Sequence, residues 1–213
     1  MSCPICEKRR PERYCPSRGE RICAICCGKE REVTIDCPSD CPHLISARRY
    51  QVEHRKPPEL GEIPFPDIDL TPDLIRRNQA PLSGFGLTIL KFAQENPALR
   101  DPEVLAALGA FAETCRTLES GIIFERPPDA PLPRVLYGEL AKFIEDFRKS
   151  EAQQTAFSPL KNSEIFRLIV FLLRVGRRES NGRPRSRAFL DFLRAQFPSE
   201  PEAQSEAPRI IVP

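Results

Sequence analysis

Apolar side chains in the C-terminal part of the chain recur at the spacing that helices require. Between residues 83 and 197 they return at steps of three and four, which places them on one face of an α-helix. Asp101 as N-cap and Pro102 in the first turn predict the start of one such helix. Residues 160–177 are apolar almost all round, which is typical of a helix at the centre of a bundle. The pattern therefore predicts an all-α helical domain of about five helices over residues 83–197.

The residues on either side of this domain follow different patterns. Residues 46–56 contain neither Pro nor Gly, which predicts a helix that leaves the N-terminal region. Residues 57–82 contain six prolines and few apolar side chains, so we expect an extended linker laid on a surface. Residues 198–213 are rich in Pro, Glu and Ala, and this composition predicts a disordered tail. No apolar stretch reaches the length of about 20 residues that a bilayer-spanning helix needs, so we expect no membrane partner.

Composition and charge limit the size of the core and the classes of function that the chain can have. Apolar residues make up 40% of the chain and aromatic residues 8%, which allows only a modest core. The formal net charge of +2 argues against a protein that coats nucleic acid over its whole surface. The first residues lack the apolar segment of a secretory signal, which predicts a cytoplasmic location. In that reducing compartment, clustered cysteines indicate metal or redox chemistry rather than disulfides.

Eight of the nine cysteines lie near the N-terminus and mark residues 1–45 as a separate cysteine-rich unit. Four of them form two pairs, each with two residues between its members, namely Cys3 with Cys6 and Cys23 with Cys26. Two such pairs present four thiolates to one tetrahedral ion, because each short loop directs both sulfurs to the same side. The sequence therefore predicts a first metal site at these four residues.

The other cysteines of this unit make up a second complete ligand set. Its members are Cys15, Cys27, Cys37 and Cys41. Because Cys15 lies between the two pairs of the first set, the two sites must be interleaved. His43 is an alternative to Cys27 as the fourth ligand of the second site. The unit has too few apolar residues to fold alone, so we expect metal binding to supply about 10 kcal/mol of folding free energy per site.

Zinc is the metal that this ligand set favours, with two ions bound by the unit. An iron–sulfur cluster is the alternative, since ligation by cysteine alone suits both metals. The adjacent residues Cys26 and Cys27 also allow a thiol redox switch. A site closed by four cysteines leaves no open coordination position, which argues against catalytic zinc.

The order of these cysteines resembles that of a known class of finger. The CPIC pair, the single Cys15, the CAIC pair and a late cysteine pair together resemble the cross-brace binuclear zinc fingers of the B-box and HIT-type class. The resemblance covers residues 3–43 only. It departs from the B-box pattern because the late pair is Cys37 and Cys41 instead of two histidines, and because Cys27 is additional. The resemblance implies a role in protein interaction or assembly.

These observations predict a zinc-binding adaptor or scaffold that mediates protein–protein interaction, and not an enzyme. The only histidines are His43 and His54, and no nucleophile–base pair or phosphate-binding loop is recognisable. Cys115 lies in a helical apolar stripe, so we interpret it as a core residue. A thiol-based redox or metal sensor is one alternative to the adaptor role.

A nucleic-acid-binding zinc-finger protein is the other alternative. The stretch Asn181–Arg185 resembles the Gly-Arg-Pro centre of an AT-hook, which inserts arginines into a narrow minor groove. The simpler interpretation is an Asn-Gly turn with solvated arginines before the next helix. Residues 1–56 carry twelve basic against eight acidic residues, but eight thiolates with two zinc ions add about −4 and cancel this surplus. The candidate contacts for nucleic acid are Arg183, Arg185, Arg187, Arg48 and Arg49.

Overall fold

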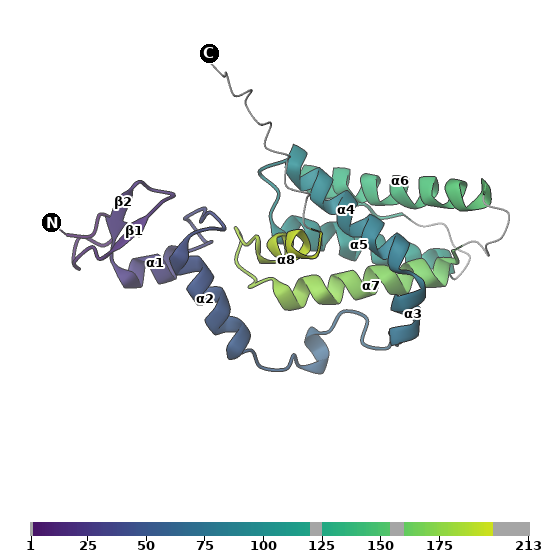
Figure 1. Cartoon of the computed structure of the whole chain (residues 1–213), viewed down its shortest axis with the longest axis horizontal. Coiled ribbons are helices and arrows are strands. Elements are labelled where there is room, and N and C mark those ends of the chain that lie inside the picture. The colour runs from purple at the N-terminus through teal and green to yellow at the C-terminus, as the bar shows by residue number, and fades with distance from the viewer. Residues whose placement is uncertain (1, 120–124, 154–159, 198–213) are drawn as a thin grey trace, which may run out of the picture.

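The computed structural model describes residues 2–119, 125–153 and 160–197. Within these residues the chain is a small cysteine-rich finger followed by an all-α bundle, so the predicted fold class is confirmed. Figure 1 shows the finger at one end of the molecule and the bundle at the other. The expected disordered tail at residues 198–213 lies outside the described residues.

The finger consists of one short hairpin, one short helix and the helix by which the chain leaves it. These elements are β1 (Arg13–Cys15), β2 (Glu20–Ile22), α1 (Ala24–Glu30) and α2 (Pro42–Glu53). The strands pair antiparallel, with Arg13 opposite Ile22, and Gly19 takes a φ of +67° in the turn between them. The sulfur of Cys23 caps α1 by accepting a hydrogen bond from the backbone N–H of Cys26. A potential ligand thus also starts the helix.

The proline-rich segment after α2 is partly helical, although we expected it to be extended. It contains a 3₁₀ turn at Leu60–Glu62 and the short helix α3 (Pro72–Arg77). Thr71 caps α3 by accepting a hydrogen bond from the backbone N–H of Leu74 at 3.3 Å. Proline at the first position of a helix loses no hydrogen bond, because the backbone N–H of another residue there would have no partner within the helix. Pro72 is therefore compatible with the start of α3.

Arg174 of the bundle holds this segment in place. Its Nε donates to the carbonyl of Pro64 at 3.0 Å, and its Nη2 donates to the carbonyls of Phe65 and Ile68. The ring of Phe65 packs edge-on against that of Phe166, with centroids 5.4 Å apart. The segment thus lies on the surface of the bundle, with one arginine and one aromatic ring as its anchors.

Five helices build the bundle. They are α4 (Gln79–Glu95), α5 (Asp101–Glu119), α6 (Pro131–Gln153), α7 (Asn162–Glu179) and α8 (Ala188–Gln196). α7 packs against α5 and α8, and its residues Phe166, Leu168 and Ile169 are at most 1% exposed. The bundle thus has the expected number of about five helices, and α1, α2 and α3 raise the count for the described residues to eight α-helices. The described part of the chain offers no helix capable of spanning a bilayer.

Asp101 has a different role from the one that its position predicted. Its buried carboxylate accepts hydrogen bonds from the backbone N–H groups of Phe189 at 3.1 Å and Leu190 at 3.2 Å. It also accepts one from the hydroxyl of Ser186 at 2.6 Å. Asp101 therefore caps α8, and the prediction that it caps its own helix is wrong. The N–H groups at the start of α8 have no partner within their helix, and in the folded chain they lie beside Asp101 and donate to its carboxylate.

Candidate metal centre

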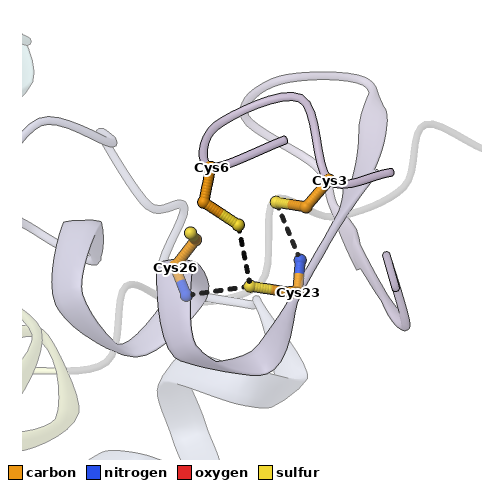
Figure 2. A group of neighbouring side chains, drawn as sticks. All are labelled: Cys3, Cys6, Cys23 and Cys26. Atoms are coloured by element: carbon orange, nitrogen blue, oxygen red, sulfur yellow. Dashed lines mark hydrogen bonds between the residues drawn. The ribbon is translucent and has the colours of Figure 1, made fainter. Parts of the chain in front are cut away.

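Four cysteines from two segments of the finger lie together (Figure 2). Cys3 and Cys6 come from a tight loop, in which the backbone N–H of Glu7 donates to the carbonyl of Cys3 at 2.7 Å. Cys23 precedes α1 and Cys26 lies in its first turn. All four Sγ atoms lie within 4.8 Å of one another. These are the four residues of the first predicted site.

The spacing of the sulfurs fits a tetrahedral metal site. A zinc ion with four Zn–S bonds of about 2.3 Å has neighbouring sulfurs about 3.8 Å apart. In the structure the Sγ atoms of Cys6 and Cys23 are 3.9 Å apart. A disulfide would bring two sulfurs to about 2 Å, and all nine cysteines of the chain are free. The four side chains therefore fit a shared metal ion and not a cross-link.

Backbone N–H groups are directed at sulfurs of this site. The N–H of Cys23 donates to Sγ of Cys3 at 3.3 Å, and the N–H of Cys26 donates to Sγ of Cys23 at 3.4 Å. Burial raises the pKa of Cys3, but several backbone N–H groups together outweigh it and lower that pKa below its ordinary value. The backbone N–H of Lys8 is the main cause that lowers the pKa of Cys6 to about 6. Two of the four sulfurs are therefore readily deprotonated.

Cys26 has the opposite behaviour. Burial, followed by the sulfurs of Cys23, Cys6 and Cys3, raises the pKa of Cys26 to about 12. Four thiolates this close repel one another, so the last proton is hard to remove until a cation lies between them. A divalent metal ion removes that repulsion and holds all four sulfurs deprotonated. Since three of the four cysteines are buried, the arrangement fits a closed structural site with no position for a substrate.

The second predicted ligand set is not gathered as closely. Among the described residues, the first set is the only group of three or more metal-ligating side chains whose ligand atoms all lie within 4.8 Å. Burial raises the pKa of Cys37 and a backbone hydrogen bond from Glu32 opposes it, while the nearby charges of Cys41, Glu32 and Cys15 raise it further. Three members of the second set therefore share one neighbourhood. A second metal ion at this place stays a prediction.

Cys27 and His43, the alternative fourth ligands, lie in similar surroundings. The guanidinium groups of Arg13 and Arg31 donate to Sγ of Cys27 at 3.8 and 3.6 Å. Burial, and then the charges of the same two arginines, lower the pKa of His43. Metal-bound sulfur accepts such charge-assisted hydrogen bonds, and a neutral imidazole is the form that binds metal. Both residues therefore stay candidates for the fourth position.

The loop before α8 lies against the finger. Arg183 donates from Nη1 to the carbonyl of Gly28 at 3.1 Å and to the carbonyl of Arg31, both at the C-terminal end of α1. Arg187 forms an ion pair with Asp36 at 3.2 Å. The helix end gains partners for its free carbonyl groups from these contacts. The expectation that the arginines of this loop are solvated is therefore wrong for Arg183 and Arg187.

Arg48 of α2 belongs to the same contact between finger and bundle. Its guanidinium pairs with Glu32 at 2.8 Å and with Asp191 at 2.6 Å. Of the five arginines considered as contacts for nucleic acid, Arg49 and Arg185 are the exposed ones. The other three are engaged within the chain.

The acidic partners of these arginines could not be found by sequence reasoning. Glu32 is only 1% exposed and accepts a hydrogen bond from Asn181 at 2.6 Å. Asp36 and Asp191 likewise pair with residues that lie far away in the chain. No motif or periodicity marks such residues, because their partners are defined only by the folded arrangement.

Comparison with known proteins gives no match, since no family model, no curated protein and no solved structure corresponds to this chain. The resemblance to the B-box and HIT-type class therefore stays a prediction from residues 3–43. What is established is a cluster of four cysteines that fits a metal ion.

Proposed function

We propose that this chain is a zinc-binding adaptor that mediates protein–protein interaction in the cytoplasm, with the finger as its docking surface. A metal ion held by four thiolates has no open position for a reacting group, so its contribution is to fold the finger. The finger in turn is fixed to the bundle through Arg48, Arg183 and Arg187. A rigid module attached to a helical domain is suited to holding a partner in a defined orientation.

Exposed apolar side chains are concentrated on the finger and α2, and this observation carries the proposal. The described residues contain eight large hydrophobic side chains that are exposed, and six of them belong to this part. They are Tyr14, Ile25, Val33, Ile45, Tyr50 and Val52. The exposure of these side chains to water is unfavourable in the free protein, and aromatic and aliphatic side chains are the usual anchors of protein interfaces.

We further propose two zinc ions per chain. The first is supported by the sulfur spacing at Cys3, Cys6, Cys23 and Cys26. The second is supported by the neighbourhood of Cys15, Cys37 and Cys41. Native mass spectrometry with elemental analysis tests both. Two zinc ions per chain support the scheme, one ion restricts it to the first site, and iron with visible absorbance would replace zinc by an iron–sulfur cluster.

The adaptor role is tested by cross-linking and affinity capture from the cells that express the chain, with mass spectrometry of the captured proteins. The test variant combines Ile25→Glu with Ile45→Glu on the finger and α2. The matched control combines Leu87→Glu with Val135→Glu, which are equally exposed positions in the bundle. We expect the wild type and the control to capture the same partners and the finger variant to lose them. Capture that survives in the finger variant contradicts the proposal.

A further inference from the structure

A groove of about 1010 Å³ runs between α2, the segment that follows it and the C-terminal part of α7. Its two walls are joined by the ion pair of Arg55 with Glu179 at 3.1 Å and by the contact of Arg174 with the carbonyl of Pro64. Because these contacts hold both walls in the free protein, a ligand would meet a preformed site. Binding to it would cost little ordering entropy.

The groove is strongly cationic. Its lining contains six basic side chains and only two carboxylates, those of Glu62 and Glu179. The basic side chains are Arg48, Arg55, Lys56, Arg174, Arg177 and Arg178. Arg48, Arg55 and Arg178 form ion pairs with carboxylates. The guanidinium of Arg174, however, has only backbone carbonyl groups as partners, and these carry no net charge.

Lys56 and Arg177 give the groove positive charge that no carboxylate compensates. Within the described residues neither side chain makes a hydrogen bond or an ion pair, and both line the groove. Together with Arg174 they form a set of cations without carboxylate partners. The positive electrostatic field of these three side chains attracts anionic groups and orients them before contact.

We propose that this groove binds an extended acidic segment of a partner protein, a step that rests on the adaptor function proposed above. The walls also contain apolar side chains, including Val52, Ile63 and Ala188, which suit the aliphatic residues between acidic ones. The described residues that line the groove include no aromatic side chain. Single-stranded nucleic acid is bound largely by stacking of its bases on aromatic rings, so the lining favours a peptide.

The test uses the zinc-loaded full chain and a fluorescein-labelled peptide of glutamate, leucine and serine, followed by fluorescence anisotropy. The groove variant combines Lys56→Glu with Arg177→Glu. The control variant combines Lys91→Glu with Lys142→Glu, two exposed lysines outside the groove that give the same change in net charge. We expect the groove variant to bind the peptide at least about tenfold more weakly and the control to bind it like the wild type.

Two outcomes overturn the proposal. Equal weakening in both variants would show attraction by net charge alone, and tighter binding of oligo(dT) than of the peptide at the groove would make it a nucleic-acid site. The zinc content and thermal melting of each variant establish that it is folded. Because the capture experiment above depends on Ile25 and Ile45 and the anisotropy experiment on Lys56 and Arg177, failure of the groove proposal can be distinguished from failure of the adaptor proposal.

Discussion

Arg48 and Glu32 form an ion pair in which the guanidinium Nη2 lies 2.8 Å from the carboxylate Oε1. Glu32 is almost completely buried, and its other carboxylate oxygen accepts a hydrogen bond from Asn181 at 2.6 Å. Arg48 extends the pair to Asp191 of α8. These contacts join the finger, α2 and the loop before α8. The cysteine-rich unit and the bundle are therefore fixed to each other by paired charges, of which Glu32 is buried and Arg48 and Asp191 are partly buried.

Glu32→Ala should lower the stability of the whole chain. The substitution leaves Asn181 without its acceptor and leaves Arg48 with Asp191 alone. Because the lost carboxylate is buried, we expect the free energy of unfolding to fall by about 2–3 kcal/mol, measured by urea denaturation of the zinc-loaded chain. Glu20→Ala is the control, since it removes an exposed pair with Arg18 and should cost about 0.5 kcal/mol or less. Equal losses of unfolding free energy in the two variants would contradict the expectation that the buried carboxylate contributes more.

Removal of the metal should unfold the finger and leave the bundle intact. The buried core of the finger contains four cysteines and only two isoleucines, Ile22 and Ile35, which is too little apolar surface to hold a fold without metal. The bundle has a core of its own. We therefore expect a strong chelator to abolish the finger's structure while far-UV circular dichroism keeps most of the helical signal. Loss of most of that signal would mean that the bundle depends on the metal.

The first metal site could be predicted because its geometry is local. In each Cys-x-x-Cys pair the spacing brings the two sulfurs to the same side, in a tight loop for Cys3 and Cys6 and in the first turn of α1 for Cys23 and Cys26. Spacing alone therefore defines half of the site. The same holds in part for α7, whose run of apolar residues predicts a buried helix. Eight of its residues are buried, but Arg167, Arg177 and Arg178 leave one face exposed, so the expectation that the helix is apolar almost all round is wrong. Both features are properties of short stretches of chain, and sequence reasoning reaches them directly.

The contacts between finger and bundle could not be predicted in the same way. Asp101 carries the signature of a local N-cap, yet it caps a helix that begins far along the chain. Arg183 lies in a stretch that resembles a DNA-binding motif, yet its partners are carbonyl groups of α1. In both cases the residue has chemistry that suits several partners, and only the tertiary arrangement selects one of them.

Cys115 should stay unreactive when the other thiols are exposed. It lies in the core of the bundle, and burial raises its pKa to about 12. At pH 8 the thiol is therefore protonated, whereas disulfide reagents such as DTNB need the thiolate. We expect DTNB to react quickly with the eight finger cysteines of the chelated chain and with Cys115 only after urea is added. Cys115→Ala should remove the reaction that appears on addition of urea. Rapid reaction of all nine thiols without urea would contradict the prediction.

Gly84 and Gly138 both lie inside bundle helices, but only Gly84 faces a neighbouring helix closely. A Cβ at Gly84 of α4 would lie 2.1 and 2.5 Å from ring atoms of Phe143 in α6, whereas one at Gly138 would meet nothing within 4 Å. Gly84→Ala should therefore lower the free energy of unfolding by about 1–3 kcal/mol, because the Phe143 ring must leave its packed position. Gly138→Ala should raise it by about 0.5–1 kcal/mol, because alanine loses less backbone entropy in a helix. The urea midpoints of the two zinc-loaded variants should consequently shift in opposite directions, and a stabilising shift for both would show that α4 and α6 do not approach this closely.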